Sequence, residues 1–333
     1  MIFLDMHCDT ISELCDRKDA GGTDVFLREN GLQLDIRRLR EVGYLLQNFA
    51  LFVDAGRFSD PWERFLCLAD FYDEQMAQNV DSIAPVLCFS DIAKNRQAGK
   101  LSALLTIEEG EVLCGETEKL RAAYGRGVRM ITLTWNYENQ LGYPNIPTTG
   151  VGMTPRLMVP ETEKGLKQRG IDLLFEMETM GIIIDVSHLS DAGFWDVVSH
   201  AKKPFVASHS NARTVSPCVR NMTDDMIRAL SNAGGVMGLN FCMDFLKLAR
   251  IGKKDELLDA VCAHAKHIVH VGGEDILGLG SDFDGIVQNA DLAGAESIPK
   301  LFDALKTCGF TDRQLDKIAS GNVLRLYQDT LPH

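Results

Sequence analysis

The chain has 333 residues, of which 34 are lysine or arginine and 47 are aspartate or glutamate, so its formal net charge is −13. Its 45 % apolar and 24 % charged residues are ordinary for a soluble globular protein, and this balance excludes an intrinsically disordered chain. The acidic excess repels phosphate backbones and argues against nucleic-acid binding. Because no apolar run approaches the roughly 18 residues that span a bilayer, we also expect no membrane partner.

The nine cysteines are scattered, odd in number and contain no C-x-x-C pair. That pattern is typical of reduced thiols in a cytosolic enzyme rather than of a disulfide framework. The first residues reach His7 without a basic stretch followed by a long apolar one. We therefore expect no secretory signal and a cytoplasmic location.

Eight short apolar runs recur along the chain, and each ends in polar or charged residues. Because the runs are mostly apolar without alternation, they are typical of strands buried on both faces. In chain order they are residues 2–6, 48–53, 102–107, 130–134, 182–186, 205–207, 236–240 and 276–280. Amphipathic stretches that predict helices lie between them, at residues 61–79, 165–180, 223–232 and 255–271. This alternation predicts a parallel sheet with crossover helices.

Eight strands in a chain of this length predict an α/β fold, a (β/α)8 TIM-like barrel with insertions. A doubly wound open sheet is the alternative, but it usually carries a Gly-rich turn after its first strand, where this chain has His7-Cys8-Asp9. Residues 135–160 are rich in Gly, Pro and Asn and predict a long loop, which in a compact enzyme is often part of the active site. Without a linker or repeat, residues 1–333 are interpreted as a single domain.

Three of the eight histidines follow predicted strands: His7, His188 and His209. The carboxyl ends of barrel strands meet at one open face, so these imidazoles are expected to converge. Residues i and i+2 of a strand point to the same side, so His7 and Asp9 can approach one ion while Cys8 points away and packs. Imidazole and carboxylate ligands in this arrangement predict a site for zinc or a similar divalent metal.

Two acids, Glu108 and Asp282, also follow predicted strands. One carboxylate can bridge two metals, and another can carry protons beside a metal-bound water. Glu109 and Asp284 compete with them for these roles. We interpret Glu109, Asp284 and Glu111 as solvated loop carboxylates.

Two further features have alternative interpretations. Arg220 follows the last of the three histidines; it either clamps a substrate carboxylate through a bidentate hydrogen bond or is a surface arginine at a helix start.

His264, His267 and His270 form an H-x-x-H-x-x-H pattern. Because that pattern lies in a predicted helix, we expect a structural role on the outside or bottom of the barrel.

Eight motifs span most of the chain: DMHCDT, LLTIEEG, GVRMITLTWN, IIIDVSHLSD, FVASHSNAR, VRNMTDDMIRAL, GLGSDFDG and SGNVLRLY. In this order they resemble the membrane (renal) dipeptidase family, zinc dipeptidases of the amidohydrolase-like barrels. The resemblance implies two zinc ions. His7 and Asp9 would hold one, His188 and His209 the other, and Glu108 would bridge them.

The resemblance also implies roles around the metals. Asp282 would orient the bridging hydroxide, contact the amino end of the substrate and shuttle a proton to the leaving amine, while Arg220 would bind the C-terminal carboxylate. The chain departs from the family at two positions: Glu109 stands where a glycine is usual, and Trp135 where many members have a substrate-contacting histidine. An indole at position 135 can contact substrate but cannot polarise a carbonyl.

The expected function is therefore that of a zinc dipeptidase that acts on small dipeptides; the sequence leaves open whether a D-residue at the C-terminal position is accepted. The family also implies a homodimer. Two alternatives remain: a metal-dependent barrel hydrolase acting on another amide, a lactone or a phosphoester, and a barrel that binds a ligand without catalysis.

Overall fold

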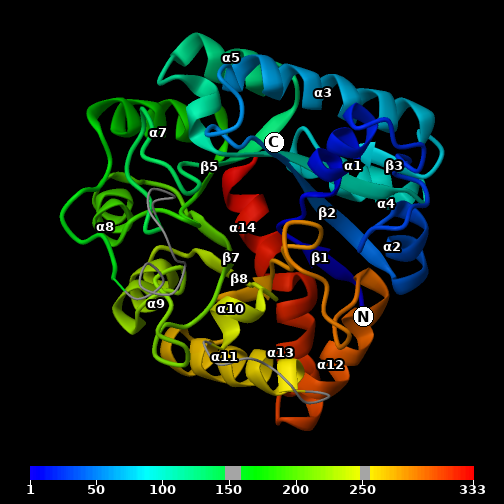
Figure 1. Ribbon diagram of the computed structural model, residues 1–333. Coiled ribbons are helices and arrows are strands. Elements are labelled where there is room, and N and C mark those ends of the chain that lie inside the picture. Colours follow the sequence, from blue (N-terminus) through cyan, green and yellow to red (C-terminus); the bar gives the residue numbers. More distant parts are fainter. Residues whose placement is uncertain (147–158, 248–255) are drawn as a thin grey trace.

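Strands and helices alternate along the chain (Figure 1). The computed structural model describes residues 1–146, 159–247 and 256–333; residues 147–158 of the predicted loop lie outside this part. The strands are β1 (Phe3–Asp5), β2 (Tyr44–Phe52), β3 (Ile83–Pro85), β4 (Leu101–Glu108), β5 (Val128–Thr132), β6 (Ile183–Asp185), β7 (Val206–Ser210), β8 (Val236–Leu239) and β9 (Leu277–Leu279). 

The helices lie mainly outside the ring of strands (Figure 1). They are α1 (Thr10–Asp19), α2 (Ile36–Val42), α3 (Pro61–Gln78), α4 (Phe89–Gln97), α5 (Thr117–Gly125), α7 (Gln168–Met180), α8 (Asp191–His200), α9 (Asp224–Asn232), α10 (Met243–Leu246), α11 (Glu256–Gly272), α12 (Ile298–Thr307), α13 (Asp312–Asp316) and α14 (Asn322–Thr330). Three short helical segments are η1 (Gly110–Leu113), η2 (Ala295–Ser297) and η3 (Lys317–Gly321).

The sheet closes into a barrel. The strand order is β2-β1-β9-β8-β7-β6-β5-β4-β3, and β2 also pairs with β4. All pairings between the described strands are parallel. Eight strands form the ring, while β3 pairs only with the first residues of β4. The predicted (β/α)8 TIM-like barrel is thereby confirmed.

All eight predicted strands differ from the observed ones in their bounds, most of them by one residue at an end, whereas β2, predicted at 48–53, begins four residues earlier, at Tyr44. The strand predicted at 130–134 is β5, which begins two residues earlier because Val128 pairs with Leu105 of β4. The strand predicted at 205–207 is β7, which continues to Ser210 because that residue pairs with Leu239 of β8. Thus His209 lies inside β7 rather than beyond it. The apolar run in the sequence ends at the first polar residue, whereas backbone pairing between strands continues past it. The sequence pattern therefore misplaces the strand ends.

The predicted helix starts depend on side-chain caps. Asp60 accepts a hydrogen bond from the backbone of Glu63 at the start of α3, and Thr223 caps α9 in the same way. These bonds satisfy backbone donors that have no partner within the helix. The helix predicted from residue 165 begins at Gln168 instead, because Leu166 pairs as an isolated bridge with Gly142.

One end of the barrel is filled and covered by apolar side chains. Eight residues in strands or directly after them pack in one cluster: Leu4, Met6, Leu46, Leu104, Met130, Ile183, Val206 and Val236. Since several of them are the first residues of their strands, this is the amino-terminal end. Helix α14, red in Figure 1, covers it with Val323, Leu326 and Tyr327. No helix in the described residues has the length and apolar character needed to cross a membrane.

Candidate metal centre

The residues predicted to bind metal and to carry out catalysis meet at the opposite, carboxyl-terminal end of the barrel. They come from the ends of five strands or from the segments that follow: His7 and Asp9 after β1, Glu108 at the end of β4, His188 after β6, His209 in β7 and Asp282 after β9. All six side chains are buried. A closed parallel barrel delivers strand ends to one face whatever their separation in the chain, which explains why residues up to 275 positions apart are neighbours.

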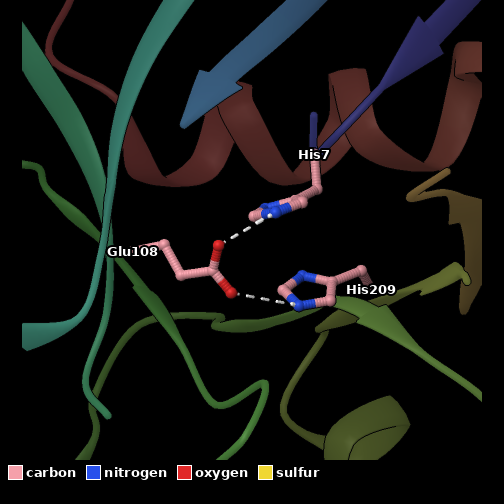
Figure 2. A group of neighbouring side chains, drawn as sticks. All are labelled: His7, Glu108 and His209. Atoms are coloured by element: carbon pink, nitrogen blue, oxygen red, sulfur yellow. Dashed lines mark ion pairs between the residues drawn. The ribbon is translucent and has the colours of Figure 1, made fainter. Parts of the chain in front are cut away.

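Glu108 lies at the centre of the cluster. Its Oε2 is 3.2 Å from His7 Nε2, and its Oε1 is 3.0 Å from His188 Nε2 and 3.6 Å from His209 Nε2. Figure 2 shows one oxygen of this carboxylate facing His7 and the other facing His209. A carboxylate placed in this way can share its two oxygens between two cations.

The other acids lie beside His7. The Nε2 atom of His7 is 3.4 Å from Asp9 Oδ2 and 3.8 Å from Asp282 Oδ1. Two triplets among the described residues have ligand atoms close enough to hold a metal: His7, Glu108 and His209, and His7, Asp9 and Asp282. The residues therefore offer overlapping coordination sites rather than a single one.

Hydrogen bonds at the far side of each ring fix the tautomers of His188 and His209. His188 Nδ1 donates to Asn136 Oδ1 at 3.0 Å. Ser208 Oγ donates to Asp185 at 2.5 Å and therefore accepts from His209 Nδ1 at 2.7 Å. Both rings consequently present the lone pair of Nε2 to the cluster. Such outer partners are a regular feature of metal-binding histidines.

The donor set fits a cation. His188 Nε2 and His209 Nε2 are 3.0 Å apart, so two lone pairs face each other, an arrangement that is repulsive unless a positive charge lies beside them. His7 Nε2 and Asp9 Oδ1 are buried without a hydrogen-bond partner, although buried polar groups normally have one. Imidazole nitrogens with carboxylate oxygens are the ligands that zinc takes in hydrolases.

The electrostatics of the cluster also favour a bound cation. Burial raises the pKa of the Glu108 carboxyl to about 8, against the lowering effect of the His7 charge. Burial likewise raises the pKa of Asp282 to about 6. For His188 and His209, burial lowers the pKa well below its usual value, so both rings are neutral and able to bind a metal. A cation in the cluster would favour the ionised carboxylates.

Two residues of the cluster have strained backbones. His188 and Asp282 have φ values of 69° and 64°, in the left-handed region that non-glycine residues seldom adopt. Such conformations persist where surrounding contacts impose them, and they gather at functional sites. Asp5, fully buried, supplies one such contact, since its Oδ1 accepts hydrogen bonds from the backbones of His7 and Ser281.

A cavity of about 400 Å³ opens onto the cluster, a volume suited to a small molecule. Four cluster residues line it: Asp9, Glu108, His188 and Asp282. Opposite and around them lie Phe52, Trp135, Asn136, Phe245, Ile286 and Val287. Trp135 and Asn136 belong to the predicted long loop, whose first residues thus reach the cavity.

Arg220 lies deeper than a surface residue. Its exposed fraction is 4 %, so the interpretation of Arg220 as a surface arginine is wrong. Its Nη2 donates to the carbonyl of His209 at 3.3 Å, its guanidinium lies 5.2 Å from the ring of Phe245, and its buried Nε has no partner. Arg220 therefore lies behind a residue of the cavity wall and keeps an unused donor.

Two acids interpreted as solvated are not. Glu109 is fully buried and accepts hydrogen bonds from the loop that follows β5. Asp284 is half-buried and accepts from Thr10 Oγ1 and from the backbone of Gln33. Solvation was predicted for both because the sequence does not show which loops fold back over them. Glu111 is half-buried and binds the backbone of Gln140.

The H-x-x-H-x-x-H pattern lies in α11 and away from the cluster, as predicted. His264 is buried, its Nδ1 accepts from the backbone of Ala212, and its Nε2 donates to the carbonyl of Leu246. His267 pairs with Asp224 at the start of α9. These two histidines therefore hold α11 against its neighbours.

Sequence reasoning missed the residues that orient the ligands. Asn136 lies in a predicted loop whose sequence has no periodic pattern. Asp185 lies in a predicted apolar strand, where its sequence position does not indicate a partner. Ser208 directly precedes His209 in the sequence. A weak signal was present in Asp185 and Ser208, because each lies close to a predicted histidine ligand, but only the fold reveals their partners.

Comparison with known proteins agrees with the geometry. Residues 1–331 match the model of the membrane dipeptidase family, peptidase family M19. The uncharacterised protein in the pqqA 5′ region of Klebsiella pneumoniae is 36 % identical over 251 residues, which cover 73 % of this chain and 88 % of that one. An uncharacterised dipeptidase of Schizosaccharomyces pombe is 31 % identical over 320 residues, 91 % of this chain and 74 % of the relative.

Two solved structures extend the likeness over the whole fold. A dipeptidase of metallopeptidase family M19 superposes with a TM-score of 0.88 at 25 % identity, covering 100 % of this chain and 99 % of that one. A metallopeptidase of Rhodobacter sphaeroides, bound to a phosphinate mimic of the dipeptide L-Ala-D-Ala, gives 0.86 at 25 % identity with 99 % of each chain covered. The resemblance stated from the motifs is thus confirmed: the chain belongs to the membrane dipeptidase family, peptidase family M19, and is a metallo-dipeptidase.

Proposed function

We propose that this metallo-dipeptidase uses two zinc ions, with His7 and Asp9 holding one, His188 and His209 holding the other, and Glu108 bridging them. The observation that carries the proposal is the position of the Glu108 carboxylate, whose two oxygens each lie close to a different imidazole nitrogen. When bound, two zinc ions would lower the pKa of a shared water towards neutrality and polarise the peptide carbonyl.

Asp282 would carry the proton. Its Oδ2 accepts a hydrogen bond from Asn240 Nδ2 at 2.9 Å, which fixes the carboxyl and leaves Oδ1 beside His7 at the cavity. Its raised pKa of about 6 suits a group that takes a proton from water and gives it to the leaving amine. Asp282 would also bind the amino group of the substrate.

The two ends of a dipeptide would be held apart. Arg220 is a buried guanidinium with a free Nε donor, which supports a role in binding the C-terminal carboxylate once a substrate displaces the ring of Phe245. Trp135 would contact the substrate from the cavity wall. The Rhodobacter sphaeroides relative was solved with a mimic of L-Ala-D-Ala, which supports acceptance of a D-residue at the C-terminal position.

Hydrolysis of a panel of L,L and L,D dipeptides by zinc-loaded and metal-free protein tests the proposal. We expect turnover of both stereochemical classes by the loaded form and none by the metal-free form. Equal cleavage of Leu-Leu or Ala-Ala without metal would refute it. Hydrolysis of L,L dipeptides alone would remove only the D-residue part.

An alternative keeps the barrel and the metals but acts on another amide, a lactone or a phosphoester. Arg220→Ala separates the two functions, because only a dipeptide presents a free carboxylate for Arg220 to bind. We expect this variant to lose kcat/KM on dipeptides while cleavage of uncharged amides stays as it was. An equal loss on both substrate classes would favour the alternative.

We also infer that the whole chain is a single domain acting in a reducing compartment such as the cytoplasm. All nine cysteines carry free thiols, which supports such a location. A single thermal unfolding transition and fractionation of cells test these two points.

A further inference from the structure

We propose that Glu109 is a positioning residue: its buried carboxylate holds Trp135 in the cavity wall, and the enzyme thereby favours dipeptides that carry a bulky apolar side chain. The proposal rests on the proposed dipeptidase function. It concerns a residue next to the metal centre that contributes no atom to it.

The backbone of Glu109 is strained. Strand β4 ends at Glu108, and the next residue has a φ value of 92°, a region where glycine is at ease and a side chain is costly. Glu109 is also fully buried, which adds the cost of removing a carboxyl from water. A buried, strained acid is retained only where its contacts offset both costs.

Those contacts are three hydrogen bonds accepted by the carboxylate. Oε1 accepts from the backbone of Glu111 at 2.8 Å and from Asn139 Nδ2 at 2.5 Å. Oε2 accepts from the backbone N–H of Trp135 at 3.2 Å. The carboxylate therefore ties the loop after β4 to both Trp135 and Asn139 of the loop after β5.

Asn139 extends this connection. Its Nδ2 also donates to the carbonyl of Leu133, and its Oδ1 accepts from the backbones of Leu141 and Gly142. The two loops are in direct contact as well, because a Cβ on Gly110 would collide with the carbonyl of Leu133. The turn that carries Trp135 is thus fixed at both ends, and the carboxyl group of Glu109 lies at its centre.

The side chain held in this way forms an apolar wall. The Trp135 ring lies 4.8 Å from the ring of Phe52 and 6.3 Å from that of His188, between centroids. Phe245 and Val287 line the same cavity, and Val287 is 79 % exposed. Apolar surface left wet beside the reacting groups gains free energy when a bulky apolar side chain covers it. Such a wall discriminates by size and not by charge.

The Glu109 carboxylate does not itself line the cavity, and both of its oxygens accept from loop donors. Its influence on the substrate must therefore pass through Trp135. Removing the carboxylate should weaken selectivity between dipeptides while leaving the metal ligands in place.

The test compares kcat/KM for Ala-Ala, Leu-Ala and Ala-Leu in zinc-loaded wild type and variants, with zinc content measured for each. In the wild type we expect one of the leucine dipeptides to exceed Ala-Ala by about tenfold or more, the range that a few methylenes give in an apolar pocket. Glu109→Gly relieves the strain but removes the carboxylate. It should reduce that preference at least about fivefold while zinc content and the Ala-Ala value stay close to wild type.

Three further variants sharpen the test. Trp135→Ala should lose the preference by itself, and the double variant Glu109→Gly/Trp135→Ala should lose no more, because the two residues act as one unit. Glu109→Gln, which turns an amide N–H₂ towards one of the donors, gives an intermediate loss and serves if the glycine variant does not fold. Glu111→Gln is the matched control, since among the described residues its side chain accepts from the backbone of Gln140 and does not touch Trp135, and it should keep the preference.

The outcomes separate this inference from the proposed function. A wild type that hydrolyses none of the dipeptides contradicts the dipeptidase function itself. An active wild type whose preference survives in Glu109→Gly and Glu109→Gln overturns the positioning role of Glu109. Equal loss on all three dipeptides, or loss of zinc, also overturns it, because the residue would then support the metal centre and not selectivity.

Discussion

The two ends of the barrel differ in the side chains that fill them and in the strain of their backbones. At the amino-terminal end, apolar strand residues pack against α14, and the buried Tyr327 hydroxyl donates to Asn48 Oδ1 at 2.8 Å. At the carboxyl-terminal end, four residues after strands have positive φ values: Glu109, His188, Asp282 and Asp284. Buried ligand atoms without partners also gather at that end.

The difference indicates that one end supplies stability and the other supplies chemistry. The carboxyl ends of the barrel strands form the site, while apolar packing at their amino ends holds the strands together. Strain and unpaired acids at the carboxyl end lower stability unless a cation is bound. Substitutions at the two ends should therefore separate activity from stability.

The largest effect on activity is expected for Glu108→Gln. The amide cannot bridge two cations, so we expect kcat/KM for Leu-Leu to fall on the order of 10³-fold or more, with loss of bound zinc. Activity assays and metal analysis check this. Full activity in the variant would show that Glu108 is not a ligand.

The same substitution should stabilise the metal-free protein against unfolding at neutral pH. Burial raises the pKa of Glu108 from 4.5 to about 8, so between these values the folded state binds a proton that the unfolded state has released. The free energy of unfolding therefore falls as pH rises across that range. Chemical denaturation of metal-free protein should show a shallower fall for Glu108→Gln than for wild type; equal slopes would contradict this sign.

Asp282→Asn should be next in size. The amide keeps the shape of the side chain but cannot carry a proton, so we expect a loss of about 10² to 10⁴ in kcat with two zinc ions retained. Turnover and zinc content are measured on the same sample. This result would also exclude a barrel that only binds its ligand, whereas unchanged turnover would remove Asp282 from the reaction.

Gly285→Ala should have a smaller effect that is confined to the same end. A Cβ at this position would collide with the carboxylates of Asp9 and Asp282. We expect zinc affinity and kcat/KM to fall about 10- to 100-fold, as for other displaced metal ligands, with little change in Tm because Gly285 is exposed. Unchanged zinc affinity would show that the two carboxylates can move without cost.

Tyr327→Phe should leave activity unchanged and affect only stability. It removes the hydroxyl that pairs with Asn48 and leaves a buried amide oxygen without a partner, at a cost of about 1–3 kcal/mol. Denaturant unfolding measures the cost, and dipeptide hydrolysis provides the control. A loss of activity without a loss of stability would break the division between the two ends.

Much of this arrangement could be predicted from the sequence. His7, Glu108, His188 and Asp282 were placed correctly because each follows a short buried run, and a parallel barrel converts strand ends into neighbours. The helix start at Asp60 was also predicted, because a capping side chain acts on the backbone of the residues next to it.

What the sequence did not predict depends on contacts between distant segments. Glu109 was interpreted as solvated because two of the three donors that it binds come from the loop after β5, which folds over it. The orientation of His188 by Asn136 spans 52 positions. Strand β3 was missed because three residues that include Pro85 carry no hydrophobic pattern, and β3 exists only through its pairing with β4.

Titration of zinc into metal-free protein, followed by calorimetry and by Leu-Leu hydrolysis in the same samples, tests the central claim most directly. The account predicts two zinc ions bound per chain, with activity complete only when both are bound. Full activity at one zinc ion per chain, or hydrolysis in the absence of any metal, would contradict it.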